Sequence, residues 1–253
     1  LVPNVNIPNY AEFYEMRHFT PAPEGCSYGT WPEENAVPFG TDQLFICKNM
    51  PGLKVAVEIC EDLWTPNPPS VRHAMHGATV IVNLSASDET TGKDIYRRSL
   101  VSGQSARLVC GYIYADAGEG ESSTDLVFAA HNLIAENGTV LKQSQRFKNE
   151  MIYSELDIHK LRSERRRMTT YQVDGSYEYT DIEFHLKKTE ISLANPVPKV
   201  NVRMSEKPEK FRDIFQQGDG FRHSRRKICQ PLKRPTRRTK NRQRNASRTP
   251  LPL

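Results

Sequence analysis

Cys60 is the side chain best suited to covalent chemistry in this sequence. It ends the apolar run Leu53–Ile59, and Glu61-Asp62-Leu63-Trp64 and a cluster of prolines follow it. A strand that delivers a thiol to a sharp turn exposes the sulfur, and backbone N–H groups beyond the turn can bind an oxyanion. The pattern is that of an acyl-transfer nucleophile. The alternative, which this segment alone favours, is a small buried apolar residue, as free cysteine often is.

The elements that position Cys60 are predicted to alternate between strands and helices. Strands are predicted at 42–48, 53–59, 78–84 and 109–115, extended segments at 126–130 and 132–136, and helices at 70–76 and 94–108. Asn137-Gly138, which apolar pairs flank, is the strongest hairpin signal. Residues 21–40 are rich in Pro and Gly, which predicts a long surface loop. The alternation predicts an α/β domain with largely buried sheets.

The composition describes two unlike parts. Of the 253 residues 37% are hydrophobic, and the mean hydropathy is −0.63. Residues 221–253 hold 12 of the 35 basic residues and none of the 30 acidic ones, which leaves residues 1–220 with a net charge of −7. The overall charge of +5 therefore comes from the tail. The body is typical of an ordinary acidic soluble domain.

The cysteines and the apolar runs indicate the cellular compartment in which the protein resides. The five cysteines form an odd set without a CxxC pair or a zinc spacing, which predicts a reduced, cytoplasmic setting and no metal site: Cys26, Cys47, Cys60, Cys110 and Cys229. Apolar runs such as 78–84 are too short to span a bilayer, and no signal peptide is recognised. Because the chain starts at Leu1 rather than Met, we expect the natural N-terminus to lie upstream.

The pattern of strands and helices decays after residue 172. Residues 173–217 are predicted to be a linker that ends in the start of a helix at 210–217, and residues 218–253 a disordered basic tail. The sequence changes so abruptly that we expect a frameshift in the coding DNA near Gln217. The alternatives are an inert solvated tail and a basic arm that contacts nucleic acid. Phe221 is the only aromatic of the tail, so nucleic-acid binding is the least favoured.

Five motifs follow one another along residues 1–172. They are Pro8-Asn9-Tyr10-Ala11-Glu12-Phe13-Tyr14-Glu15, Val57-Glu58-Ile59-Cys60-Glu61-Asp62-Leu63-Trp64, Asn83-Leu84-Ser85-Ala86-Ser87, Ala117-Gly118-Glu119-Gly120-Glu121-Ser122-Ser123-Thr124-Asp125-Leu126 and Leu161-Arg162-Ser163-Glu164-Arg165. In this order they resemble the glutaminase (nitrilase-fold) domain of bacterial glutamine-dependent NAD(+) synthetases. Within that family Cys60 stands at the position of the nucleophile.

The resemblance implies a nitrilase-like four-layer αββα sandwich, incomplete here at its N-terminus, and a Glu-Lys-Cys triad. In the family Glu is the general base, Cys attacks the side-chain amide of glutamine to form a thioester, and Lys stabilises the oxyanion. The released ammonia passes through a tunnel to a second domain. There ATP, with Mg²⁺, activates nicotinate adenine dinucleotide for amidation to NAD(+). The resemblance also implies a homo-oligomer and no cofactor in the present chain.

Several positions match the family's glutamine pocket. Tyr10 matches an aromatic that lines the pocket, and a packed loop tyrosine is the alternative. Glu12 stands where relatives often keep a supporting carboxylate, and a solvated loop acid is the alternative. Glu61 and Trp64 follow the nucleophile and are expected to shape the substrate site, although Trp64 suits a core position equally well.

Two further positions match residues that hold the amino-acid end of glutamine. They are Ser87 and Lys93, and ordinary turn residues are the alternative for both. Lys93 stands where some members of the family have an arginine. Gly118-Glu119-Gly120 lacks the third glycine of a phosphate loop and is interpreted as a family loop.

Three departures from the family bear on activity. Asn4 follows Val2-Pro3 where the family has a lysine, and losing such an oxyanion donor costs about 3–4 kcal/mol, or on the order of 10²–10³ in rate. The triad Glu is expected upstream of residue 1, and no Ser-Gly-Gly-x-Asp-Ser phosphate loop occurs. We therefore expect a fragment without glutaminase turnover of its own. The alternative from another class is a catalytically dead binding or structural remnant.

Overall fold

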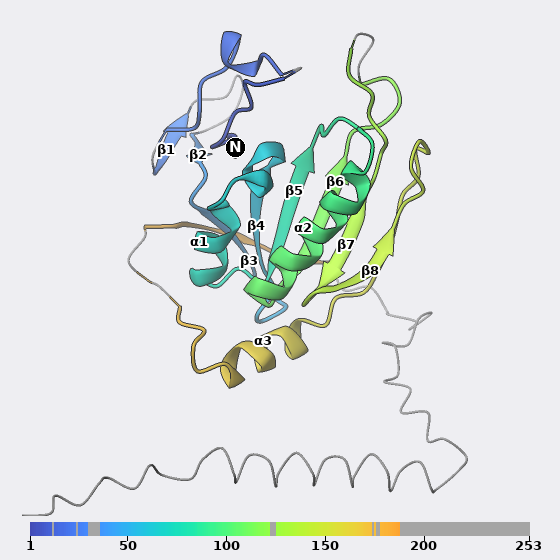
Figure 1. Ribbon diagram of the computed structural model, residues 1–253. Helices are drawn as coiled ribbons and strands as arrows, with labels where there is room; N and C mark the ends of the chain where they lie inside the picture. The colour runs from blue at the N-terminus through green and yellow to red at the C-terminus, as the bar shows by residue number, and fades with distance from the viewer. Residues whose placement is uncertain are drawn as a thin grey trace, which may run out of the picture. The chain divides into compact units, whose positions relative to one another are not determined.

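The computed structural model describes residues 1–11, 13–23, 25–29, 36–121, 125–173, 175 and 178–187 (Figure 1). All of them belong to the first of the two units into which the chain divides, Leu1–Leu193. Three predictions fall outside the described residues, namely the site residue Glu12, the helix at 210–217 and the basic tail at 218–253.

Seven strands form one mixed sheet in the order β8-β7-β6-β5-β4-β3-β9. They are β3 (Gln43–Cys47), β4 (Lys54–Ile59), β5 (Val80–Ser85), β6 (Gly111–Asp116), β7 (Leu133–Glu136), β8 (Thr139–Gln143) and β9 (Thr180–Phe184). β4, β5 and β6 run parallel, whereas β3 and β7 pair with them antiparallel. The carboxyl ends of the three parallel strands therefore meet at one edge, where open α/β sheets bind their ligands.

Two turns join antiparallel neighbours as the sequence predicts. Gly52 lies between β3 and β4 at a φ of +100°, and a Cβ there would lie 2.4 Å from the Cδ atom of Arg162. Both the dihedral and the close contact require glycine. Asn137 and Gly138 connect β7 to β8 with φ values of 44° and 86°, the pair of positive angles that a type I′ turn needs. Both predicted hairpins are confirmed.

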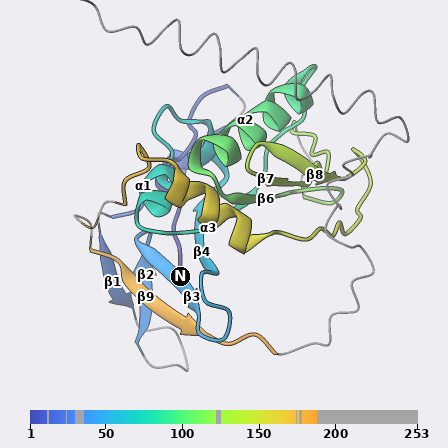
Figure 2. The same cartoon turned by 90° about the horizontal axis from the view of Figure 1, so that it is seen from below.

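Helices cover one face and one end of the sheet. They are α1 (Pro69–Met75), α2 (Lys93–Leu108) and α3 (Ile158–Arg167). α1 and α2 lie on the same face, and α3 crosses the end at which the parallel strands begin (Figures 1 and 2). Arg165 of α3 donates hydrogen bonds to the carbonyl oxygens of Leu108 and Val109, just before β6. The prediction of an α/β fold is confirmed.

The hydrophobic core lies between the sheet and the two covering helices. It includes Ala56, Ile81, Tyr112 and Leu133 from the strands and Val101 and Leu108 from α2. Because side chains alternate along a strand, the residues between these point to the opposite face. That face is only half buried, and Leu84 on it is 53% exposed.

Glu58 is a buried acid that ties the sheet to both covering helices. Its carboxylate accepts hydrogen bonds from the Ser70 N–H at the start of α1 and from the Tyr112 hydroxyl of β6. The Ser70 hydroxyl in turn accepts a hydrogen bond from Gln104 of α2 at 2.9 Å. Burial raises the pKa of Glu58 to about 7, although its hydrogen bonds lower it. The acid therefore fixes α1 against the strand that leads to Cys60.

The prediction of a long loop over residues 21–40 is wrong in part. β1 (Cys26–Gly29) and β2 (Val37–Gly40) pair antiparallel as a separate two-stranded ribbon. The Leu1 amino group donates to the Pro38 carbonyl, and the Gly40 N–H donates to the Leu1 carbonyl. The strands have only four residues each and contain Gly and Pro, so their pairing rather than any local signal makes them extended.

Two other segments differ from the sequence prediction. β9 lies within the segment predicted as linker, and its parallel pairing with β3 joins residues about 137 positions apart, such as Gln43 and Thr180. Such distant pairing has no local signature. The extended segment predicted at 126–130 forms only an isolated bridge between Asp88 and Phe128. Among the described residues no helix could span a bilayer, since the longest, α2, has 16 residues.

Candidate active site

Cys60 lies at the carboxyl end of β4 in a strained turn. Its φ is +47°, which costs a non-glycine residue of order 1–3 kcal/mol and persists only where the surroundings impose it. Asn83 of β5 imposes it. The Asn83 Oδ1 atom accepts the Cys60 N–H at 3.1 Å, and the Asn83 Nδ2 group donates to the Cys60 carbonyl at 3.3 Å. Because both backbone groups of Cys60 are held by one buried side chain, the Cα–Cβ bond that carries the thiol has a fixed direction.

Asp62 holds the same turn from the other side. This residue is 1% exposed, and its Oδ2 atom accepts the Ile59 N–H at 2.9 Å. Its Oδ1 atom accepts the backbone N–H of Asn6 at 2.8 Å and the Asn6 side-chain amide at 2.9 Å. Burial raises the pKa of Asp62, and these donors lower it. Asp62 thus ties the N-terminal segment to the turn and brings Asn4 to the site.

The Cys60 sulfur has two hydrogen-bond donors. The Ser85 hydroxyl donates to it at 3.5 Å, and the Ala86 backbone N–H also lowers the pKa of the thiol. Burial is the largest effect on that pKa and raises it, and the charges of Glu61 and Asp116 raise it further. In the described part of the chain, neither a lysine nor a carboxylate forms a hydrogen bond with the sulfur.

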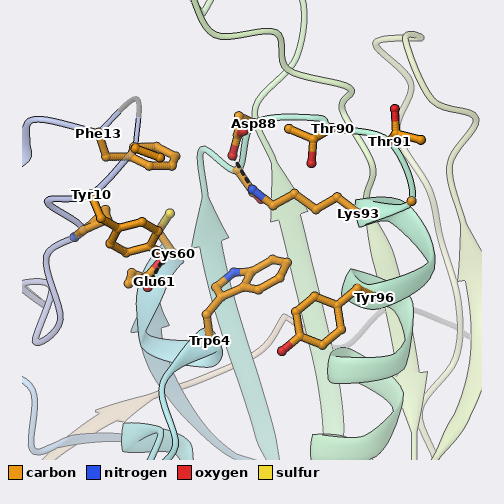
Figure 3. Close-up of a pocket in the computed structure, with 14 residues that line it drawn as sticks. Tyr10, Phe13, Cys60, Glu61, Trp64, Asp88, Thr90, Thr91, Lys93 and Tyr96 are labelled. Atoms are coloured by element: carbon orange, nitrogen blue, oxygen red, sulfur yellow. Dashed lines mark hydrogen bonds and ion pairs between the residues drawn. The ribbon is translucent and has the colours of Figure 1, made fainter.

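A cavity of about 450 Å³ opens beside the sulfur, and we call it the Lys93 cavity (Figure 3). Its lining includes Tyr10, Phe13, Cys60, Glu61, Trp64, Ser87, Asp88, Lys93 and Tyr96. Lys93 pairs with Asp88, and its ammonium lies 5.1 Å from the centre of the Trp64 ring. Trp64 packs edge-on against Tyr96 at 5.3 Å. A cation is therefore held at one side of the cavity between an acid and an aromatic face.

An acid lies in the same cavity, close to the thiol. The Tyr10 hydroxyl donates to Glu61 Oε1 at 2.8 Å. Burial raises the pKa of Glu61, whereas the hydrogen bond from Tyr10 and the charge of Lys93 lower it. Burial and the Glu61 contact raise the pKa of Tyr10 to about 12, so its hydroxyl stays a donor at neutral pH. The cavity offers separate positive and negative groups to a zwitterion.

A second cavity of about 500 Å³ reaches the sulfur from the N-terminal segment, and we call it the Asn4 cavity. Its lining includes Pro3, Asn4, Ile7, Phe13, Glu15, Phe19, Cys60 and Glu121. The Asn4 Oδ1 atom accepts the Asn6 N–H at 3.1 Å, which leaves the Asn4 amide group as the polar end of the side chain. Cys60 thus borders two cavities.

A buried guanidinium supports the loop that follows β5. Arg97 of α2 is fully buried and donates to Glu89 Oε2 at 2.8 Å and to the Ser87 hydroxyl at 3.2 Å. The Ser87 N–H donates to Asp116 Oδ1 at 3.0 Å. Burial raises the pKa of Asp116 to about 6, and its Oδ2 atom lies 3.9 Å from Arg97. Ser87 is only 3% exposed, so its hydroxyl serves this network as well as the cavity wall.

The structure brings most of the predicted site residues together. Tyr10, Cys60, Glu61, Trp64, Ser87 and Lys93 line the Lys93 cavity, and Asn4 lines the Asn4 cavity beside Cys60. Trp64 fits both of its interpretations, because it lines the cavity and packs against the core. Glu12 lies outside the described residues. The roles of all these residues stay predictions.

Sequence reasoning missed the residues that hold the nucleophile. Asn83 and Ser85 lie in a recognised motif, but only the parallel pairing of β4 with β5 shows that they flank Cys60. Tyr114 and Asp116 reach the site in the same way through the pairing of β5 with β6. One signal in the sequence could have found them. Polar residues at the end of a buried strand that pairs with the strand before Cys60 are expected at the same edge of the sheet as the thiol. Among the described residues, no cluster of His, Cys, Asp and Glu could hold a metal ion.

Comparison with known proteins gives a family match and longer relatives. The family described as "Carbon-nitrogen hydrolase" matches residues 1–166. A glutamine-dependent NAD(+) synthetase from Mycobacterium tuberculosis is 40% identical over 205 residues, which are 80% of this chain and 30% of that protein. The chain therefore spans about a third of the length of the curated relatives that it matches.

Solved structures give a matching fold. A glutamine-dependent NAD(+) synthetase from Cytophaga hutchinsonii matches with a TM-score of 0.50 and 29% identity, over 59% of this chain and 23% of that chain. A carbon-nitrogen hydrolase from Helicobacter pylori G27 matches with a TM-score of 0.50 and 18% identity, over 65% of this chain and 54% of that chain. The second likeness is one of fold.

Proposed function

The chain belongs to the carbon-nitrogen hydrolase family, and from this premise we propose that its Cys60 site acts on the side-chain amide of glutamine. The predicted nitrilase-like fold and the resemblance to glutamine-dependent NAD(+) synthetases are confirmed by the matches. The observation that carries the proposal is a thiol fixed at a strand end beside a cavity with a separated cation and acid. The alternative of a binding remnant is not favoured.

The charges of the Lys93 cavity suit the amino-acid end of glutamine. In our proposal Lys93 binds the α-carboxylate, and Glu61, supported by the Tyr10 hydroxyl, binds the α-ammonium group. Ser87 and Trp64 contribute wall surface. A ligand held in this way points its side-chain amide at Cys60, which lines the same cavity. The volume of about 450 Å³ accommodates one small amino acid.

The reaction that we propose has two steps. The Cys60 thiolate attacks the amide carbon and forms a C–S bond, and the carbonyl oxygen becomes an oxyanion. The C–N bond then breaks, and the nitrogen takes, through water, the proton that the thiol released and leaves as ammonia. Water attacks the thioester, the C–S bond breaks, and glutamate and the free thiol result.

The oxyanion of the first step needs donors. The Cys60 N–H already donates to Asn83, so a backbone donor has to come from a later residue of the turn. Asn4 borders the sulfur through its own cavity and stands where the resemblance places a lysine. A neutral amide stabilises an oxyanion less than an ammonium does, because hydrogen bonds from charged donors are roughly twice as strong as neutral ones. We propose that Asn4 limits the rate of this chain.

The ammonia has a proposed use in the longer relatives. Their name joins glutamine to NAD(+) synthesis. We propose that the ammonia amidates nicotinate adenine dinucleotide in an ATP- and Mg²⁺-dependent step of the full-length enzyme. Cytoplasmic location, homo-oligomer assembly and the absence of nucleic-acid binding remain predictions.

Affinity labelling tests the proposal without requiring turnover. The probe is a glutamine analogue in which a chloromethyl ketone replaces the side-chain amide, so that the thiolate displaces chloride. We expect saturable labelling of Cys60, measured by peptide mass spectrometry, and protection by glutamine but not by asparagine. Labelling that rises linearly with the concentration of the probe, without protection by glutamine, contradicts glutamine recognition. Cys60→Ala is the control for the site of labelling.

A further inference from the structure

A two-step hydrogen-bond chain leads from the nucleophile into the core. The Ser85 hydroxyl lies 3.5 Å from the Cys60 sulfur, and the Tyr114 hydroxyl lies 2.6 Å from the Ser85 hydroxyl. Ser85 is the last residue of β5, and Tyr114 lies two residues before the end of β6. The parallel register pairs Ser85 with Asp116. The hydrogen bonds therefore link the ends of β4, β5 and β6 at one edge of the sheet.

The direction of each hydrogen bond between Tyr114, Ser85 and Cys60 follows from burial and from the charge of the thiolate. Tyr114 is 1% exposed, and burial holds the pKa of its hydroxyl well above the ordinary value, so it stays protonated. The sulfur of a thiolate carries no proton, so the Ser85 hydroxyl has to donate to it. The Ser85 oxygen is then free to accept, and the Tyr114 hydroxyl donates to that oxygen.

We propose that Ser85 is a catalytic residue of the Cys60 site, a hydroxyl that donates to the thiolate, and that Tyr114 is the positioning residue that directs it. The inference rests on the proposed function in taking Cys60 as the reacting thiol. The Ser85 hydroxyl acts on the thiolate before it attacks the substrate carbon, whereas the oxyanion donors act on the substrate oxygen after the attack.

The charges around Cys60 make this donor important. Glu61 and Asp116 both oppose the thiolate, and burial opposes it most strongly. Asn4 brings no positive charge to the sulfur. Among the described residues the opposing effects come from the Ser85 hydroxyl and the Ala86 N–H. A buried anion without a cation depends on such hydrogen bonds. Once the thioester forms, the sulfur is neutral, so the Ser85 donor favours the thiolate over the acyl-enzyme.

The test measures the Cys60 thiol itself. The rate of alkylation of Cys60 by iodoacetamide is followed from pH 6 to pH 10 by peptide mass spectrometry, which separates Cys60 from the other cysteines. For Ser85→Ala we expect the apparent pKa to rise by about one unit and the rate at pH 7 to fall roughly tenfold. For Tyr114→Phe, which keeps the ring, we expect a rise of about half a unit and a rate roughly threefold lower. Ser85→Thr keeps the hydroxyl and stays near the wild type.

Tyr112→Phe is the matched control. It removes another fully buried tyrosine hydroxyl from the same face of β6, but that hydroxyl contacts Glu58 and the Asn83 side chain and not Ser85. We expect no change in the alkylation profile. An unchanged profile in Ser85→Ala overturns the inference, and so do equal effects of Tyr114→Phe and Tyr112→Phe. If Ser85→Ala does not fold, the pair of tyrosine variants decides alone.

The result separates this inference from the proposed function. Iodoacetamide does not need the glutamine cavity, so the profile can shift in Ser85→Ala even if the chloromethyl ketone shows no protection by glutamine. In that case the hydroxyl donor stands and glutamine recognition fails. Protection by glutamine together with an unshifted profile gives the reverse conclusion.

Discussion

The two sides of the candidate site are held in place differently. On the sheet side, the edge of β4, β5 and β6 fixes Cys60 through Asn83, Ser85 and Asp62, with most polar groups buried and paired. On the loop side, the described residues of the segment 1–23 contact the turn chiefly through Asn6 with Asp62 and Tyr10 with Glu61. Tyr10 is 59% exposed. The nucleophile is held by buried residues of the sheet, whereas its partners on the loop are held to the sheet by a few hydrogen bonds.

The difference shows on which side a substitution can alter the chemistry without disturbing the fold. The sheet side holds the thiol through the contacts of Asn83, Asp62 and Ser85. The loop side carries Asn4 where the resemblance predicts a lysine, and a loop side chain can change without disturbing the core. Loss of activity can therefore occur on the loop side while the fold remains. The predictions below test whether the two sides separate in this way.

Asn4→Lys is expected to have the largest effect. An ammonium in the Asn4 cavity stabilises the thiolate and the oxyanion, so the first turnover of Cys60 with glutamine should be about 10²–10³ faster. The measurement is the ammonia released in that first turnover, because this step does not need the general base that activates water, and Cys60→Ala in the same background is the control. The free energy of unfolding should change little. A variant that the chloromethyl ketone labels but that releases ammonia no faster than the wild type contradicts the proposal that Asn4 on the loop side limits the rate.

Glu58→Gln tests how far the sheet side depends on a buried acid. The pKa of Glu58 is raised from an ordinary 4.5 to about 7, so the native state binds the proton more tightly than the unfolded state. The stabilisation is complete below pH 4.5 and is lost as the pH rises through 7, a change of about 3 kcal/mol. The wild type should lose this stability between pH 5 and pH 8, whereas Glu58→Gln should not.

Urea unfolding at the two pH values measures that difference. Other groups also make stability depend on pH in this range, because their pKa values differ between the folded and unfolded states, such as His73 with a pKa lowered from 6.5 to about 3 and Asp116 with one raised from 3.8 to about 6. They cancel when the variant is compared with the wild type. Glu183→Gln, on the exposed strand β9, is the matched control and should keep the wild-type pH dependence. Equal pH dependence of Glu58→Gln and the wild type would count against a neutral buried Glu58.

Asn83→Ala tests the backbone clamp on Cys60. It leaves the Cys60 N–H and carbonyl without their partner, which should lower the free energy of unfolding by about 1–3 kcal/mol. The freed turn should also slow saturable labelling of Cys60, because the sulfur no longer has one direction. Asn67→Ala, in the exposed proline loop, is the control. A variant with wild-type stability and labelling rate would show that the turn holds itself.

The sequence predicts the two sides unequally well. The strand before Cys60, its hairpin at Gly52 and the parallel strand after α1 follow from local patterns of apolar and turn residues. The family motifs also place six residues in one cavity. Ser85, Asn83 and Tyr114 could not be assigned, because their roles arise from pairing between strands that are 20 or more residues apart. β9 was not predicted for the same reason, whereas the β1–β2 ribbon was not predicted because its four-residue strands, which contain Gly and Pro, have no local strand signal.

Tyr10→Phe is expected to have the smallest effect, and it probes the loop side alone. It removes the hydrogen bond to Glu61, so the pKa of Glu61 should rise, because that hydrogen bond lowers it. A weaker negative charge at Glu61 binds the ammonium group of glutamine less well. We expect about threefold weaker protection by glutamine in the labelling assay and a change in unfolding free energy below about 0.5 kcal/mol.

Tyr14→Phe is the matched control, since Tyr14 lies in the same segment and packs on Arg17. Equal protection in the two variants would mean that the loop does not act on substrate through Tyr10. A large loss of stability in Tyr10→Phe would instead make the loop part of the fold, and the contrast between the two sides would fail.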